Sequence, residues 1–225
     1  MSFLTKKISR EKLDALVKPY QTDLKTLEIG ARGAPSYATF FSHRVGVDIE
    51  AGPGVDVVAS VYDLPFESES FDVVLCLSVL EHVEHPRDGI KEMRRVLKKG
   101  GTILVSVPFL FPIHDSPNDY WRFTKYGLRK LFIDWDIKVL QGESDIGTSF
   151  AILLQRVGFQ TKLRLNRLTK ASVFLAAKLV RHMGWFVTGV YGDIGKHVEE
   201  PDAFTSSFFL VAKKPLVEKD DSAQE

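Results

Sequence analysis

The chain has 225 residues, of which 44% are hydrophobic, so it can bury a full core, and one domain with an insertion is expected. Its 30 basic and 29 acidic residues give a formal charge of +1, which excludes a strong overall basic field, and no nucleic acid is expected as a partner. The single cysteine, Cys76, cannot form an internal disulfide, and MSFLTKKISREK lacks the apolar core of a secretory signal. These features predict a reducing, cytoplasmic location.

The first part of the chain predicts a helix followed by strands and a crossover helix. Residues 1–23 are expected to form an amino-terminal helix, because REKLDALVKPY is amphipathic and Pro19 lies where a helix would end. Residues 24–143 are expected to form the core. The short apolar runs LKTLEIG, HRVGVDI, VDVVASV and SFDVVLCLS are suited to buried parallel strands. PRDGIKEMRRVLKKGG has helical spacing and a Gly-Gly stop, and TILVSVP follows as a fifth strand.

The pattern changes after Pro108. An aromatic loop, FLFPIHDSPNDYWRFTKYGLRKLF, is predicted to become a helix near Thr124. DIKVLQGES and AFTSSFFLVAKK are the last two strand candidates, and residues 144–203 between them are too long for an ordinary connection. We expect residues 144–203 to form a mostly helical insertion or cap, residues 204–214 to form the last core strand, and residues 215–225 to form a disordered tail.

Strands that alternate with helices predict an α/β domain with a mainly parallel sheet, whose ligands bind at the carboxyl ends of the strands. The turn GARGAP offers only Gly30 and Gly33, which supports a pyrophosphate site poorly. Asp48 ends the second strand, where a carboxylate can accept both hydroxyls of a ribose. A tight turn at Gly30 and a solvated acid at Asp48 are the structural alternative.

Five separate motifs share one pattern. LEIGARG, GVDIE, YDLPF with SFDVV, SVLEHV, and RVLKKGGTILVSVP follow in order over residues 24–110, and together they resemble class I methyltransferases (methyltransferase type 11-like) that use S-adenosyl-L-methionine. The resemblance implies a Rossmann-like α/β fold with a mainly parallel seven-stranded sheet flanked by helices and a helical insertion between the last two strands. It also implies S-adenosyl-L-methionine as the cofactor, which carries an adenosine but no phosphate.

The resemblance assigns cofactor contacts residue by residue. The residues implied to surround the cofactor are Glu28, Gly30, Ala31, Gly33, Asp48, Ile49, Asp63, Leu64, Leu77 and Ser78. Asp48 would hold the ribose and Ile49 would lie against the adenine. Asp63 would accept the adenine amino group, and the Leu64 amide would meet a ring nitrogen. Arg32 departs from the pattern, because the family usually has glycine at this position.

The loop after the fifth strand carries the candidate acceptor residues. DYWRFT resembles a subgroup associated with bacterial cell-surface polysaccharide and glycolipid loci. His114 is predicted to be a general base for an acceptor hydroxyl, or else to order the loop. Arg122 is predicted to hold a carboxylate or phosphate of the acceptor, or else to brace Asp119. Tyr120 would stack on a sugar or pack against the protein.

Glu81 and His82 form a carboxylate–imidazole pair. SVLEHV resembles ubiquinone-pathway O-methyltransferases, in which an additional acid precedes this pair, but Ser78 occupies that position here. We therefore expect no metal, and we expect His82 to lie over the cofactor or to fix the loop. Cys76 lies in an apolar strand and is expected to pack in the core.

Residues 170–190 of the insertion are apolar with a basic side. They are expected to cover the acceptor pocket or to form a homodimer contact. The alternative is an interfacial helix that touches anionic lipid through Trp185 and Phe186, which would place the protein peripherally at the inner face of the membrane and would suit a lipid-linked acceptor.

The leading hypothesis is O-methylation of a sugar, glycolipid or related small molecule. An NAD-dependent oxidoreductase is disfavoured by the missing third glycine of the turn. A degenerate methyltransferase fold that acts as a binding or scaffold protein is the other alternative, and Arg32 is its main support.

Overall fold

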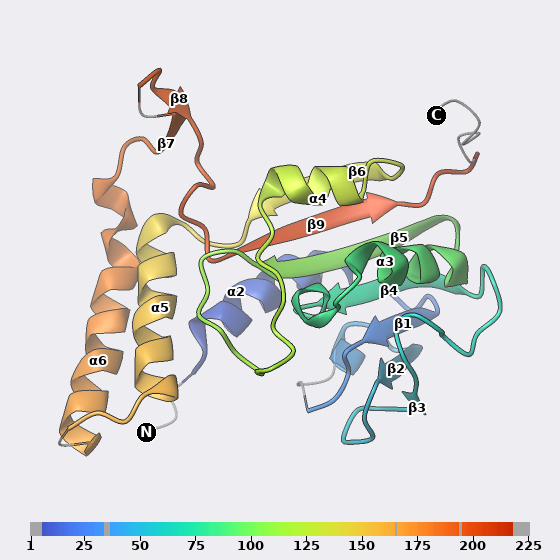
Figure 1. Cartoon of the computed structure of the whole chain (residues 1–225), viewed down its shortest axis with the longest axis horizontal. Coiled ribbons are helices and arrows are strands. Elements are labelled where there is room, and N and C mark those ends of the chain that lie inside the picture. Colours follow the sequence, from blue (N-terminus) through green and yellow to red (C-terminus); the bar gives the residue numbers. More distant parts are fainter. Residues whose placement is uncertain (1–5, 34–36, 165, 194, 218–225) are drawn as a thin grey trace.

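A seven-stranded sheet forms the centre of the molecule in the computed structural model, which describes residues 6–217 except 34–36, 165 and 194 (Figure 1). The strand order is β3-β2-β1-β4-β5-β9-β6. Its strands are β1 (Thr26–Ile29), β2 (Arg44–Asp48), β3 (Val57–Val58), β4 (Phe71–Leu77), β5 (Leu97–Pro108), β6 (Asp136–Gly142) and β9 (Ser207–Lys213). All neighbouring pairs are parallel except the two that β9 makes with β5 and β6. The predicted mainly parallel α/β sheet is therefore confirmed.

Helices cover both faces of this sheet. Successive residues of a strand point to opposite faces, and in β4 Val74 packs in one apolar cluster while Leu75 packs in the other. The first cluster contains apolar residues of α3 (Pro86–Val96) and α4 (Lys125–Leu131), and the second contains those of α2 (Ile8–Val17). Burial on both faces explains why the strand sequences are continuously hydrophobic.

The segment between β6 and β9 is a helical pair followed by a hairpin. α5 (Ile146–Gln160) and α6 (Asn166–Val180) lie side by side beyond the carboxyl end of β5 (Figure 1). Asp145 caps α5 by accepting a hydrogen bond from the Thr148 amide at 3.0 Å. The helical insertion between the last two strands is thus as predicted. No helix in the described part of the chain has the length and apolar character needed to cross a lipid bilayer.

Residues 181–199 differ from the expectation of a mostly helical segment. After the 3-10 helix η4 (Arg181–Phe186), β7 (Tyr191–Asp193) and β8 (Val198–Glu199) form a small antiparallel hairpin. Glu200, next to β8, makes an ion pair with Lys125 and accepts a hydrogen bond from the Tyr126 hydroxyl at 2.7 Å. These contacts attach the hairpin to α4.

Several element boundaries also differ from the prediction. β3 has only two residues, because the chain turns through a Ser60–Asp63 bridge directly after the bond from the Ala59 amide to the Asp48 carbonyl, which belongs to the pairing with β2. β5 begins at Leu97 and so takes in the expected Gly-Gly stop. At the amino terminus, α2 gives way at Pro19 to the 3-10 helix η1 (Lys18–Tyr20). Residues 1–5 of the expected helix and 218–225 of the expected tail lie outside the described residues.

Candidate active site

The turn after β1 is tight and lies against the end of β4. Gly30 has a φ of +75°, and a Cβ at this position would lie 2.4 Å from Cγ2 of Val79. The Gly30 and Ala31 amides both donate to the Val47 carbonyl on β2, at 2.8 and 3.1 Å. Gly33 has a φ of +66°, but a Cβ there would meet nothing within 4 Å. Glycine at position 30 therefore lets the ends of β1, β2 and β4 come together.

Asp48 is the last residue of β2 and lies at the same edge of the sheet. Its carboxylate accepts hydrogen bonds from the backbone amides of Arg32 and Glu50, both at 3.1 Å. The Arg32 side chain lies over it, with Nε 3.7 Å from Asp48 and a terminal nitrogen 2.6 Å from Glu50. The departure at Arg32 thus adds a cation directly beside the carboxylate predicted to hold the ribose.

Glu28 is buried and faces away from this turn into an ion pair. It contacts Nε of Arg44 on β2, and both side chains are almost inaccessible to solvent. Arg44 also bonds to the Gly54 carbonyl and to Asp56. Glu28 therefore fixes the loop that follows β2. Its carboxylate is used in the ion pair, so only the backbone next to it is left to border the cofactor, as the resemblance implies.

The segment 59–66 corrects one detail of the predicted adenine site. The Leu64 amide donates to Glu92 Oε1 at 2.8 Å, and Arg95 bonds to the Leu64 carbonyl at 2.9 Å. The amide is therefore already used and does not face a ring nitrogen in this structure. Asp63 is exposed, several residues beyond the end of β3 at Val58.

Residues 60–62 lie closer to that strand end than Asp63 does, and the motif comparison did not select them. Ser60 Oγ accepts a hydrogen bond from the Tyr62 amide at 3.2 Å, and Tyr62 is 42% exposed. The position of the strand end would have selected residues 60–62 as candidate site residues, since ligands of parallel sheets contact the residues that directly follow the strands. β3 ends earlier than VDVVASV suggested.

The end of β4 supplies the sulfonium side of the predicted site. Ser78 is exposed with a φ of +57°, and its amide donates to the Ser106 carbonyl on β5 at 2.8 Å. Leu77 before it is half-buried, whereas Ile49 across the edge is 72% exposed. Cys76 is fully buried, and burial raises the pKa of its thiol, which agrees with the expected packing role.

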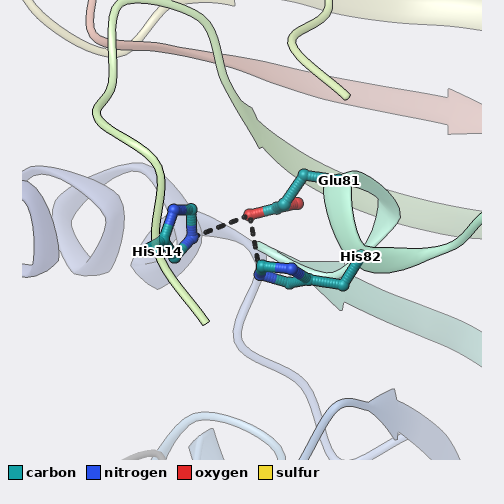
Figure 2. Close-up of side chains that lie close together, drawn as sticks. All are labelled: Glu81, His82 and His114. Atoms are coloured by element: carbon teal, nitrogen blue, oxygen red, sulfur yellow. Dashed lines mark ion pairs between the residues drawn. The ribbon is translucent and has the colours of Figure 1, made fainter. Parts of the chain in front are cut away.

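The 3-10 helix η3 (Leu80–His82) follows β4 and carries a carboxylate that two imidazoles face (Figure 2). Glu81 Oε1 lies 3.9 Å from His82 Nε2 and 3.8 Å from His114 Nε2. The two rings are T-shaped, with centroids 4.9 Å apart. Glu81 is fully buried, and burial raises the pKa of its carboxyl to about 8.

His114 is positioned by the loop after β5. Its amide donates to Asp119 at 2.9 Å, and Nδ1 lies 3.2 Å from the Pro112 carbonyl and 3.5 Å from Asp119. Nε2 therefore keeps a free lone pair, and burial lowers the pKa of the ring. His114 is available both as a base and as a ligand.

The guanidinium of Arg122 forms its hydrogen bonds within the same loop. It forms two bonds to the Asp119 carboxylate, at 2.6 and 2.7 Å, and others to the carbonyls of Phe111, Pro112 and Trp121. This pairing lowers the pKa of Asp119 to about 2. Arg122 thus braces Asp119, and the expected grip on a carboxylate or phosphate of the acceptor is corrected, because the guanidinium donors are used internally.

The two aromatic residues before Arg122 differ in their surroundings. Trp121 donates through Nε1 to the Val83 carbonyl at 3.0 Å, so it packs on the segment after η3. Tyr120 is 45% exposed, and its hydroxyl donates to Asn118 at 3.1 Å. Trp121 is 43% exposed, so both rings are accessible, but the indole Nε1 of Trp121 is already used.

α5 covers this loop from the other side. Gln160 donates to the Ile113 carbonyl at 2.8 Å, and the Arg156 guanidinium lies 4.2 Å from the centre of the Phe111 ring. The loop therefore lies between the carboxyl ends of the strands and α5 (Figure 1). A basic groove, lined by Arg87, Lys91 and Arg94 among others, lies near the amino ends of β4 and β5, away from the edge where α/β sheets bind ligands.

Comparison with known proteins agrees with this geometry. Residues 29–105 match the model of a family described as a methyltransferase domain, and solved methyltransferases share the fold of this chain. The chain has the class I methyltransferase fold. A methyltransferase of Thermotoga maritima, titled a possible histamine N-methyltransferase, is 16% identical with a TM-score of 0.57, covering 94% of this chain and 92% of that one.

Other structures show how varied the activities on this fold are. The 1,6-didemethyltoxoflavin-N1-methyltransferase of Burkholderia thailandensis, solved with S-adenosylhomocysteine, is 15% identical with a TM-score of 0.55, covering 94% of this chain and 80% of that one. The [4+2]-cyclase SpnF is 16% identical with a TM-score of 0.58, covering 93% and 82%. At these identities the likeness shows the fold, and this class I methyltransferase fold does not by itself fix the reaction.

Sequence relatives share only part of their length with this chain. An uncharacterized protein of Methanocaldococcus jannaschii is 37% identical over 111 residues, which are 44% of this chain and 54% of that protein. A demethylmenaquinone methyltransferase of Clavibacter sepedonicus is 37% identical over 92 residues, 37% of this chain and 36% of that protein. The chain spans about half or less of these curated relatives. The matched domain and the relatives named as methyltransferases support methyl transfer.

Proposed function

We propose that the protein is a methyltransferase that uses S-adenosyl-L-methionine to methylate an oxygen of a sugar, a glycolipid or a related small molecule. The observation that carries the proposal is the junction of three strand ends, where the Gly30 turn packs against Val79 and Asp48 lies at the end of β2. Such a junction suits an adenosine without phosphates. Related folds solved with S-adenosylhomocysteine support the same cofactor.

The oxidoreductase alternative loses support at the same place. A dinucleotide pyrophosphate is held at the amino terminus of a helix that directly follows the first strand. Between Ile29 and Arg44, the residues that the structure describes contain only the three-residue 3-10 helix Tyr37–Thr39. The described part of the turn, which leaves out residues 34–36, therefore offers no helix dipole to a pyrophosphate.

The transfer itself depends on alignment. The acceptor oxygen attacks the methyl carbon as the bond from carbon to sulfur breaks, and the electron pair of that bond stays on sulfur, giving S-adenosylhomocysteine. Holding the three atoms in line supplies most of the acceleration. Leu77 and Ser78 border the predicted position of the sulfur, and the Gly30 turn faces them across the edge.

The acceptor side is assigned to the loop between β5 and α4. His114 Nε2 has a lone pair that can take the proton of an acceptor hydroxyl, and Tyr120 exposes a ring on which a sugar can stack. The similarity of DYWRFT to polysaccharide-locus enzymes is the support for a glycan or glycolipid. Arg122 contributes by fixing Asp119, which in turn orients His114.

Part of the insertion is proposed to lie on a membrane surface. α6 and η4 expose Leu175, Leu179, Trp185 and Phe186, with exposed fractions between 54% and 74%. Exposed apolar and aromatic residues of this kind suit the headgroup region of a bilayer. A second copy of the chain is the competing occupant of this surface.

The scaffold alternative predicts no turnover, and a labelling experiment separates it from catalysis. The protein is incubated with methyl-labelled S-adenosyl-L-methionine and a cell extract fractionated into lipid, sugar and protein pools. We expect label in the lipid or sugar pool, and a reaction without the protein is the control. Label confined to the protein pool would contradict the acceptor class, and label in no pool would favour a scaffold.

A further inference from the structure

The three side chains Glu81, His82 and His114 meet at one point of the active-site edge, although they come from two segments of the chain. Their ligand atoms all lie within 4.8 Å of one another (Figure 2). Glu81 and His82 are carried by η3, and His114 is carried by the loop after β5. The sequence predicted no metal here because Ser78 replaces the additional acid that precedes the Glu81–His82 pair in related enzymes, and His114 was not considered as a third ligand.

Glu81 presents an unsatisfied carboxylate to this point. Its side chain is fully buried, and neither Oε1 nor Oε2 has a hydrogen-bond partner among the described residues. A buried carboxylate without a partner is costly and is normally paired or bound to a metal. A direct hydrogen bond to either imidazole would need a separation of about 2.7–3.2 Å, whereas the nitrogens lie at 3.9 and 3.8 Å.

Both imidazoles have the tautomer that a metal requires. His82 Nδ1 lies 2.7 Å from the Asn118 carbonyl, and His114 Nδ1 lies 3.2 Å from the Pro112 carbonyl. A carbonyl oxygen only accepts, so each Nδ1 carries the proton and each Nε2 directs a lone pair toward Glu81. Metal-binding histidines are held in this way, with the other ring nitrogen donating to a carbonyl or carboxylate.

We propose that Glu81, His82 and His114 bind a divalent transition-metal ion, with Zn²⁺ as the best match. Zinc accepts both imidazole nitrogens and a carboxylate oxygen, whereas magnesium and calcium prefer oxygen ligands, so the two imidazoles argue against them. Ligand atoms around tetrahedral zinc lie about 3.4 Å apart for bonds of about 2.1 Å. The two separations from Glu81 Oε1, 3.9 and 3.8 Å, therefore need to shorten by about half an ångström. The widest separation in the cluster, within 4.8 Å, needs to shorten by up to about 1.4 Å. The remaining position is open to water, to Asp115 or to an acceptor oxygen.

Asp115 lies at the solvent side of the cluster. Its carboxylate is 4.0 Å from His82 Nε2 and its side chain is 81% exposed, whereas the His82 side chain is 22% exposed. An ion can therefore enter past His82 and Asp115. A bound ion would occupy the Nε2 lone pair of His114, so the metal-ligand role and the general-base role of His114 exclude each other. Cofactor binding at the edge formed by β1, β2 and β4 involves other residues, so its measurement separates a failure of this proposal from a failure of the proposed methyl transfer.

The test is a Zn²⁺ titration of the untagged full chain by calorimetry, with Co²⁺ absorption as a second readout. We expect one ion per chain, and a loss of affinity of at least about 100-fold in Glu81→Gln, His82→Gln and His114→Gln, because removal of a ligand costs more than the roughly 10- to 100-fold of a supporting residue. His85→Gln is the matched control, since His85 is exposed and lies three residues beyond His82. Its affinity should equal that of the unaltered protein.

Thermal unfolding distinguishes a variant that has lost a metal-binding side chain from a variant that no longer folds. Zn²⁺ should raise the unfolding temperature of the unaltered chain and of His85→Gln, but not that of Glu81→Gln. Without Zn²⁺, Glu81→Gln should unfold no earlier than the unaltered chain, because it removes an unpaired buried acid. Equal Zn²⁺ affinity in Glu81→Gln and the unaltered protein would overturn the site, and so would intact binding in His114→Gln, which would leave His114 as a base only.

Discussion

Asp48 has both carboxylate oxygens engaged by backbone amides, and this fixes its orientation before any ligand arrives. If it holds the ribose, Asp48→Ala should weaken binding of S-adenosylhomocysteine roughly 10- to 150-fold, corresponding to about 1.5–3 kcal/mol for charge-assisted hydrogen bonds. Calorimetry on the purified variant measures the change. Glu50→Ala is the control, because Glu50 also contacts Arg32 but has an exposed side chain. An unchanged dissociation constant in Asp48→Ala would remove Asp48 from the site.

Gly30 and Gly33 form a matched pair in the same turn. Both have positive φ, so alanine at either position should cost about 1–2 kcal/mol of strain. Only at Gly30 would the new Cβ also collide with Val79, at 2.4 Å, which adds about 1–3 kcal/mol of overpacking. Denaturant unfolding should therefore show a larger loss for Gly30→Ala than for Gly33→Ala. Equal losses would mean that the turn does not pack on β4 as described.

At this scale the sequence predicted which residues gather at the edge better than it predicted what they bond to. Gly30, Asp48 and Ser78 follow three strands whose carboxyl ends had to meet, so their convergence could be predicted. The commitment of Arg122 to Asp119 and to carbonyls depends on the path of a loop, which has no periodic pattern. The meeting of Glu81 with His114 depends on that same path.

At the level of elements, the ends of β5 and β6 enclose a second buried acid. Glu143, just after β6, is fully buried and accepts a hydrogen bond from the Ser106 hydroxyl on β5. Burial raises the pKa of its carboxyl from 4.5 to about 7. The folded state therefore holds a proton that the unfolded chain releases between these values, so Glu143 lowers stability progressively as pH rises from about 4.5 to about 7.

The variant Glu143→Gln tests this linkage. Between pH 4.5 and pH 7 the unaltered chain should lose on the order of 3 kcal/mol more of its unfolding free energy than the variant. Urea unfolding at several pH values measures the difference. Asp136→Asn, at the exposed start of β6, is the control and should follow the unaltered chain. Parallel pH profiles for Glu143→Gln and the unaltered chain would show that Glu143 is not a buried neutral acid.

The exposed apolar surface of α6 and η4 has two candidate partners, a lipid bilayer and a second copy of the chain. If α6 and η4 touch lipid, the protein should cosediment with anionic vesicles at low salt and lose this behaviour when Trp185 and Phe186 are changed to serine. Ile133→Ser is the matched control, because Ile133 is 66% exposed and lies just after α4. A dimer that dissociates in the Trp185 and Phe186 variant, without any vesicle binding, would support a second copy instead.

The element predictions failed where a turn or a tertiary contact overrides local preference. β3 is shortened by the turn at Ser60, which is bridged to Asp63. The β7–β8 hairpin forms in a stretch expected to belong to a mostly helical segment, and Glu200 secures it through Lys125, 75 residues away in sequence. The contact between Glu200 and Lys125 leaves no local signature in the sequence.

Across the whole molecule, the order and the hydrophobic composition of the sequence segments were enough to predict the architecture. Hydrophobic runs buried on both faces, a strongly amphipathic α3 and the long β6–β9 connection predicted the sheet, its flanking helices and the insertion. The antiparallel placement of β9 between β5 and β6 was not predicted, because hydrophobicity alone does not set strand order.

The central claim, that the edge formed by β1, β2 and β4 binds S-adenosyl-L-methionine, is tested most directly by calorimetry with S-adenosylhomocysteine and NAD on the same preparation. The account predicts one S-adenosylhomocysteine bound per chain, competition by S-adenosyl-L-methionine, and no heat from NAD. Binding of NAD, or binding of neither ligand, would contradict it.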